Sequence, residues 1–272
     1  MWTVDTAAAP RSVDLFKGRF LLGLKNGSLV DIPVTSDGSG RQTTVMTSHG
    51  DGEVWGLEVV TLPDGSIRMI TSADDNRILC YDVKQHKSLA EGLVNQPTQK
   101  KKKAKPKRGG ASSMSSQPPE CQSRCVAYCV EKGHLAVANN EGIVTIREVD
   151  WKLIDEGDSI GLNTLKMTLF KKVKNAEWIE AMVYSEPNES GKQLYLAVGS
   201  HDNIIYLLDT LTYKKVHKLT GHSSFITGVD FSMDSKWIRS VCGAYELLFF
   251  DVGKKKRDPS GASNTVDVVW AS

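Results

Sequence analysis

A two-stranded pattern recurs five times along the 272-residue chain and restricts its fold more than any other feature. Each copy consists of an apolar segment, a short polar turn and a second apolar segment. Turns of the Asn-Gly, Asp-Asn or Glu-Gly kind tolerate the positive φ angles that a tight hairpin requires. The pattern therefore predicts five β-hairpins, at residues 20–33, 69–82, 135–148, 196–209 and 238–251.

Further segments extend these hairpins to four strands. Apolar segments precede four of them, at 54–60, 124–130, 178–184 and 226–231, and hydrophilic segments such as 213–219 follow as exposed outer strands. The last residues of neighbouring copies lie 42 positions apart between Asp209 and Asp251, close to the roughly 40 to 45 residues of a WD repeat. Four strands per unit make one propeller blade, so we predict an all-β fold of the WD-type β-propeller class.

The spacing of the copies sets the expected blade boundaries. Residues 1–272 are predicted to form a single propeller region with about five blades and the start of another, at 13–46, 48–92, 121–155, 175–219, 221–252 and, in part, 264–272. The additional length between copies is assigned to a basic insertion at 94–120, to 155–174 and to a loop at 186–191. Because a propeller has to close, we expect an incomplete ring: a fragment of a larger protein, or one completed by another chain.

A hydrogen-bonded network of a histidine, a strand hydroxyl, a turn aspartate and a tryptophan stabilises WD blades. His49, Ser72 and Asp75 are candidates for this network in the second copy, with Tyr81 at the tryptophan position. We also assign structural roles to Asp202 and His222. Trp55, Trp178 and Phe225 begin the innermost strands and are expected to pack between blades. No copy contains the complete set, which predicts an atypical propeller.

Four segments together resemble a known family, at residues 49–57, 196–203, 221–227 and 243–250. They are similar to the echinoderm microtubule-associated protein-like family, and the last three have the order and spacing of that family's second propeller. The resemblance covers about residues 48–272 without the basic insertion. It implies a non-catalytic microtubule-associated scaffold with tubulin or other cytoskeletal partners, located in the cytoplasm on the cytoskeleton, with a cilium or flagellar axoneme as a further expected site.

The insertion at 94–120 contains the candidate partner-binding residues, Lys100, Lys101, Lys102, Lys103, Lys105, Lys107 and Arg108. Its low-complexity composition predicts a disordered surface loop. The whole chain has a net charge of +2. Because this run alone carries seven positive charges, the rest of the chain is acidic. The run could attract the acidic tails of tubulin. Two alternatives stay open: a nuclear or ribonucleoprotein scaffold that uses the run for import or RNA contact, and a solvated insertion without a partner.

Other functional classes lack their sequence signatures. There is no nucleophile elbow, phosphate-binding loop or zinc-protease motif, so we predict no enzyme and no cofactor. The spacing of Cys121, Cys125 and Cys129 does not match a zinc site, and no metal is predicted. Nucleic-acid binding is not expected, because the basic residues are confined to one segment. No apolar stretch reaches the length of a membrane span and no secretory signal is found, so we expect an intracellular protein that does not cross a membrane.

Overall fold

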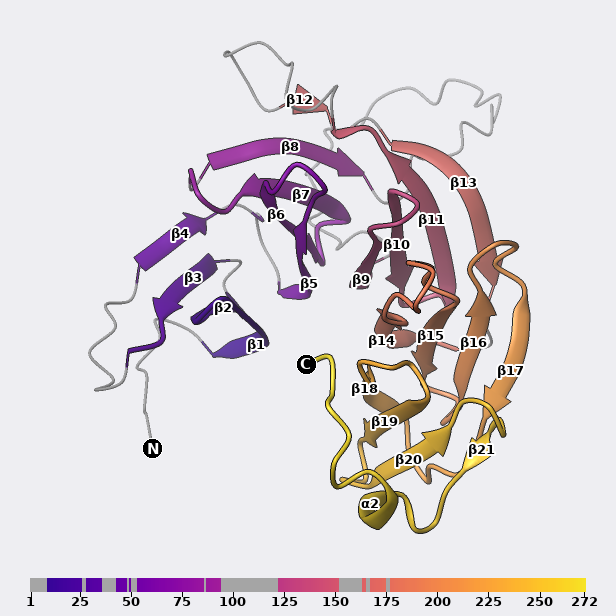
Figure 1. Cartoon of the computed structure of the whole chain (residues 1–272). Helices are drawn as coiled ribbons and strands as arrows, with labels where there is room; N and C mark the ends of the chain where they lie inside the picture. The colour runs from indigo at the N-terminus through magenta and orange to yellow at the C-terminus, as the bar shows by residue number, and fades with distance from the viewer. Residues whose placement is uncertain are drawn as a thin grey trace, which may run out of the picture.

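The computed structural model describes residues 9–25, 28–35, 43–47, 49, 53–85, 87–93, 122–151, 163–164, 167–174 and 177–272. Within these residues the chain forms five sheets, each with four antiparallel strands, and the second sheet also includes a short fifth strand that pairs in parallel. The sheets follow one another around an arc, with the first strand of each sheet nearest its centre and the fourth outside (Figure 1). The predicted all-β WD-type propeller class is confirmed.

The strands of each blade follow chain order from the innermost outward. The first blade contains β1 (Pro10–Phe16), β2 (Arg19–Leu24), β3 (Ser28–Pro33) and β4 (Thr43–Thr47). The second contains β5 (Val54–Thr61), β6 (Ile67–Ala73), β7 (Arg77–Asp82) and β8 (Lys87–Leu93). The third contains β9 (Ser123–Cys129), β10 (His134–Asn139), β11 (Ile143–Val149) and β13 (Met167–Lys174).

The last two blades continue the same order. The fourth contains β14 (Ile179–Tyr184), β15 (Tyr195–Ser200), β16 (Ile205–Asp209) and β17 (Lys215–Leu219). The fifth contains β18 (Ile226–Phe231), β19 (Trp237–Cys242), β20 (Leu247–Asp251) and β21 (Lys256–Arg257). All five predicted hairpins are therefore present, as the pairs β2–β3, β6–β7, β10–β11, β15–β16 and β19–β20.

The turns of these hairpins follow the chemistry that predicted them. Asn76 and Asn203 have φ angles of 61° and 68°, and Gly142 has a φ of 73°. Asparagine and glycine reach this left-handed region more readily than other residues. The fifth hairpin, whose turn looked atypical in the sequence, places Tyr245 at a φ of 61° instead.

Buried apolar side chains fill the space between neighbouring blades. All six residues of β10 and all seven of β6 are buried, because each strand lies inside its sheet and between two other blades. Gly199 allows a close approach: a Cβ atom there would lie 2.5 Å from Cγ2 of Ile226 in the next blade. The inter-blade core thus depends on small residues on one sheet facing branched residues on the next.

Two blades extend beyond their predicted boundaries. The outer strand of the third blade is β13, so this blade extends beyond residue 155. The connection before it contains β12 (Asn163–Thr164), which pairs in parallel with β8 of the second blade. The outer strand of the fifth blade, β21, lies beyond residue 252. The second half of β13 contains three lysines and β21 consists of Lys256 and Arg257, so neither strand has the alternating apolar pattern that marks the inner ones.

The segment 264–272 does not form the predicted strand of a further blade. It follows the short helix α2 (Gly261–Asn264) and makes one isolated antiparallel bridge, between Ser232 and Trp270. A strand is stabilised by a full row of backbone hydrogen bonds to a neighbour, and the described residues give this segment only a few.

The basic run from Lys100 to Arg108 and the rest of the insertion 94–120 lie outside the described residues. The prediction of disorder there stays a prediction. The described part of the chain has no helix with the length and apolarity required to cross a bilayer.

Candidate functional site

The antiparallel order of the strands gives the propeller two distinct faces. One carries the turns between second and third strands and the connections that lead into each innermost strand; we name it the connection face. The other carries the remaining two turns of each blade and is named the turn face. Side chains that begin the innermost strands therefore meet the second-to-third-strand turns on the connection face.

Five side chains form a continuous stack across four blades on the connection face. The guanidinium carbon of Arg124 lies 4.3 Å from the ring centre of Trp55 and 4.6 Å from that of Trp178. The ring of Trp178 stacks on His201 at 4.8 Å with an interplanar angle of 17°, and His201 lies 4.7 Å from Phe225. This aromatic stack joins the second, third, fourth and fifth blades. Trp55, Trp178 and Phe225 contact groups of neighbouring blades as predicted, with Arg124 and His201 inserted between them. They are not core residues, because the two tryptophans are half-buried and Phe225 is 38% exposed.

Acidic groups hold the stack in position. Trp55 Nε1 donates a hydrogen bond of 2.8 Å to Asp74 Oδ1, and Arg124 Nη1 lies 3.4 Å from the same oxygen. His201 Nε2 lies 2.7 Å from Glu180 Oε2. Burial lowers the pKa of Arg124, and the nearby carboxylates oppose this change. The stack is thus a charged inter-blade contact as well as an apolar one.

Acidic side chains predominate on the described part of the connection face. They are Glu53, Asp74, Asp75, Glu141, Glu177, Glu180, Asp202 and Glu246, against the basic side chains Arg11, Lys25, Arg77, Arg124, Lys218 and Arg257. A face of this charge attracts cationic groups and repels anionic ones.

A histidine network stabilises the second blade. His49 Nδ1 lies 3.1 Å from both carboxylate oxygens of Asp75, and Nε2 lies 2.8 Å from Thr71 Oγ1. His49 and Asp75 are thus at the predicted positions, but Thr71 replaces Ser72 as the hydroxyl. Neighbouring residues of a strand point to opposite faces, and Ser72 Oγ is buried without a hydrogen-bond partner among the described residues.

The fifth blade has a related but different arrangement around His222. His222 Nε2 lies 2.6 Å from Ser240 Oγ, while Nδ1 faces Glu246 Oε2 at 3.5 Å. Cys242 Sγ donates to the same carboxylate oxygen at 3.3 Å, and the Ser223 amide donates to it at 2.8 Å. The Ser223 amide, with the Cys242 thiol, lowers the pKa of Glu246 to about 2, and burial lowers the pKa of His222. The sequence reasoning identified His222 but missed Cys242 and Glu246, which follow it at a spacing that matches no familiar motif.

Asp202 has a local role in the turn of the fourth blade. Its carboxylate accepts hydrogen bonds from the Tyr206 hydroxyl and from the backbone amide of Ile204. Both contacts lie within four residues, so Asp202 fixes the β15–β16 hairpin.

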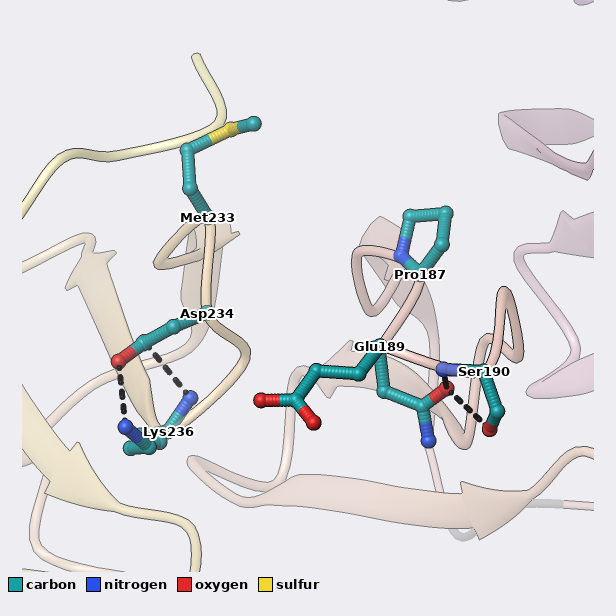
Figure 2. A pocket seen from close by; sticks show the side chains of 7 residues that line it. Pro187, Glu189, Ser190, Met233, Asp234 and Lys236 are labelled. Atoms are coloured by element: carbon teal, nitrogen blue, oxygen red, sulfur yellow. Dashed lines mark hydrogen bonds and ion pairs between the residues drawn. The ribbon is translucent and has the colours of Figure 1, made fainter.

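The turn face is hollowed between the fourth and fifth blades (Figure 2). The hollow has a volume of about 700 Å³ and lies between residues 187–190 and the turn 233–236. Asn188 Oδ1 accepts hydrogen bonds from the amide and hydroxyl of Ser190, and Lys236 Nζ lies 3.3 Å from Asp234 Oδ2. These polar groups are paired within their own loops and do not converge on a common point in the hollow, as catalytic groups do.

Comparisons with known proteins agree with this architecture. The family model described as WD domain, G-beta repeat matches residues 213–245, from the fourth blade into the fifth. The ciliary WD repeat-containing protein ctxp80 of Euplotoides octocarinatus is 41% identical over 269 residues, which is 98% of this chain and 33% of that protein. The 77 kDa echinoderm microtubule-associated protein of Lytechinus variegatus is 27% identical over 288 residues, covering 100% of this chain and 35% of that protein.

A shorter match comes from echinoderm microtubule-associated protein-like 4 of Xenopus tropicalis, which is 42% identical over 81 residues, or 28% of this chain and 9% of that protein. The chain spans about a third of the length of the two relatives that it matches throughout. The resemblance drawn from the sequence is thereby confirmed: the chain is a WD-repeat homologue of the echinoderm microtubule-associated protein-like proteins.

Proposed function

We propose that this chain is a non-catalytic protein-interaction scaffold that associates with microtubules. The observation that carries the proposal is the similarity, over nearly the whole chain, to a ciliary WD protein and to a 77 kDa echinoderm microtubule-associated protein. A propeller presents many loops on a rigid support, which suits it to docking partners. In the hollow of the turn face, Asn188 and Ser190 are paired within one loop and Asp234 and Lys236 within the other, which supports a non-catalytic role.

We assign the microtubule contact to the basic run of Lys100, Lys101, Lys102, Lys103, Lys105, Lys107 and Arg108. The reason is charge. The carboxy-terminal tails of tubulin are acidic, and the excess of carboxylates on the described connection face would repel them. The basic run is the densest group of positive charges in the sequence. A cytoskeletal location, in a cilium or flagellum, follows from the same proposal.

Co-sedimentation with assembled microtubules tests the assignment. The unmodified chain is compared with a variant in which Lys100 to Lys103 are all alanine, and with a matched control in which Lys254, Lys255, Lys256 and Arg257 are alanine. We expect the first variant to lose most of its pelleting and the control to keep it. Raising ionic strength from about 0.01 M to 0.15 M shortens the screening length from about 30 Å to 8 Å, so pelleting of the unmodified chain should fall. Equal pelleting of all three proteins would refute the assignment.

The alternative is a nuclear or ribonucleoprotein WD scaffold, and the observation that favours it is the same lysine run, which fits an import signal. Localisation of the Lys100–Lys103 variant in cells separates the two functions. Unchanged exclusion from the nucleus with reduced microtubule binding supports the cytoskeletal scaffold. Loss of nuclear import in that variant supports the alternative.

A further inference from the structure

We propose that His222, Cys242 and Glu246 in the fifth blade form a binding site for a divalent transition-metal ion, with Zn²⁺ as the ion that the donor set fits best. One nitrogen, one sulfur and one oxygen atom from these side chains lie within 4.8 Å of one another. Nitrogen and sulfur donors select borderline and soft ions such as Zn²⁺ over Mg²⁺ or Ca²⁺.

Two of the three distances between the donor atoms suit a single ion. Glu246 Oε2 lies 3.3 Å from Cys242 Sγ and 3.5 Å from His222 Nδ1. A tetrahedral Zn²⁺ with bonds of about 2.0 to 2.3 Å holds its ligand atoms roughly 3.3 to 3.6 Å apart. The sulfur of Cys242 and the nitrogen of His222 lie within 4.8 Å of each other, so these two atoms need to approach by up to about 1.3 Å to share a tetrahedral ion.

His222 supplies a second, independent observation. Its side chain is 1% exposed, and Nδ1 has no hydrogen-bond partner among the described residues although it faces the other two donors. The acceptor that faces Nδ1 is Glu246 Oε2 at 3.5 Å, which is one of the proposed ligands. Because a buried polar atom without a hydrogen bond is unfavourable, an ion bound between these groups would satisfy it. Nε2 is held by the Ser240 hydroxyl, which is the outer hydrogen bond that commonly orients a metal-binding histidine.

The second blade shows that the propeller fold does not require this donor set. Cys242 pairs with Ile226 across the start of β18, and Ala73 pairs with Val54 at the equivalent place, with the same register shift following in both blades. In the second blade the histidine nitrogen instead lies 3.1 Å from both oxygens of Asp75. The fifth blade replaces this closed network with a thiol and a more distant carboxylate.

The site is accessible from one side and its charges balance. The side chain of Glu246 is 35% exposed, which provides a path for an ion and a position for water as fourth ligand. On binding, the thiol of Cys242 loses its proton to solvent and the thiolate, the Glu246 carboxylate and the neutral imidazole bind the ion. Two negative charges then neutralise the two positive charges of the metal.

Titration of the metal-free 272-residue protein, without an affinity tag, tests the proposal. Co²⁺ serves as the probe because a thiolate ligand gives a near-ultraviolet charge-transfer band, and ZnCl₂ is then added as competitor. We expect one equivalent of Co²⁺ with this band, and its displacement by one equivalent of Zn²⁺. The Cys242→Ala variant, which introduces the residue of the second blade, should lose the band and at least about 100-fold in affinity for Zn²⁺.

Two further variants keep the test decisive if Cys242→Ala folds poorly. Glu246→Gln should weaken Zn²⁺ binding by at least about tenfold and keep the band, because the thiolate remains. Cys80→Ala, which removes a buried thiol from the second blade, is the matched control and should bind like the unmodified protein. The proposal is overturned if the unmodified protein binds no stoichiometric Co²⁺, or if Glu246→Gln and Cys242→Ala retain its affinity.

Discussion

Arg124 offers the sharpest test of how the blades are held together. Its guanidinium lies between Trp55 and Trp178, and the residue is 6% exposed. Nε and Nη1 have no hydrogen-bond partner among the described residues. The two ring faces, the ion pair with Asp74 and a hydrogen bond from Nη2 to Gln122 are therefore the main contacts of this group. A Lys ammonium keeps the charge but cannot lie flat between two indoles.

The expected loss for Arg124→Lys follows from these contacts. A cation over an aromatic ring contributes about 0.5 to 1 kcal/mol when exposed and about 2 kcal/mol when desolvated. The two rings are half-buried, and we expect the lysine to lose part of the cation–ring interaction at each of them. The total loss in the free energy of unfolding is then about 1.5 kcal/mol. For a domain of this size, 1 kcal/mol corresponds to a shift of roughly 2 to 4 °C in melting temperature, so the variant should melt about 3 to 6 °C lower.

The assay is thermal unfolding followed by far-ultraviolet circular dichroism and by calorimetry. Arg11→Lys is the matched control, because Arg11 lies 5.6 Å from the ring of Trp55, is partly exposed, and pairs with Glu53. It should change the stability by no more than about 0.5 kcal/mol. A double-mutant cycle with Trp178→Leu should give a coupling energy of about 1 kcal/mol with Arg124→Lys. Equal melting temperatures for Arg124→Lys and the unmodified chain, or zero coupling, would refute the role of the stack.

Three other changes test separate parts of the structure. Gly199→Ala should destabilise the chain by about 1 to 3 kcal/mol in urea unfolding, because the new methyl group meets Ile226; a loss below about 0.5 kcal/mol would contradict the packing. Thr71→Val should lower stability by about 1 kcal/mol through loss of the His49 contact, whereas Ser72→Ala should have a smaller effect. A larger loss for Ser72→Ala than for Thr71→Val would instead support Ser72 as the hydroxyl that contacts His49. Burial raises the pKa of Glu58 to about 8, with Asp14 and Glu186 adding repulsion, so the unmodified chain should lose stability as pH rises from about 5 to 8. The Glu58→Gln side chain stays neutral, so the stability of this variant relative to the unmodified chain should rise over that range by at most about 1.4 kcal/mol per pH unit. Parallel curves of stability against pH for the two proteins would argue against the raised pKa.

The hairpins were predictable because their signals are local. A turn such as Asp74-Asp75-Asn76 between two apolar segments specifies its own backbone angles and its own register. The outer strand β13 was not predictable in the same way, because it pairs along one edge and its lysines resemble a loop. The long connection before β13 also increases the spacing between the third and fourth copies of the repeat, so the position of this strand does not follow from the repeat length.

The aromatic stack shows the limit of sequence reasoning at the candidate site. Trp55, Trp178 and Phe225 could be placed between blades because they are large and begin apolar strands. Arg124 could not, because an arginine is ordinarily exposed and its burial depends on rings that belong to two other blades. The shift from Ser72 to Thr71 has a related cause, since the side of a strand that faces His49 is set by its pairing with neighbouring strands.

The second and fifth blades together indicate how one propeller can combine structural and chemical roles. In both, a histidine leading toward the innermost strand contacts a hydroxyl of the second strand, at 2.8 Å for His49 and 2.6 Å for His222. This shared contact fixes one imidazole nitrogen and leaves the other directed at the hairpin turn. When the turn supplies Asp75, the second nitrogen is satisfied and the network is purely structural. When the turn supplies Glu246 beside Cys242, the same nitrogen is left available to a ligand. Removing the acidic residue of the turn should therefore destabilise the second blade and, in the fifth blade, mainly weaken the binding of Zn²⁺. Asp75→Asn and Glu246→Gln are compared by unfolding and by Zn²⁺ titration. Equal losses of stability in the two variants would contradict the distinction.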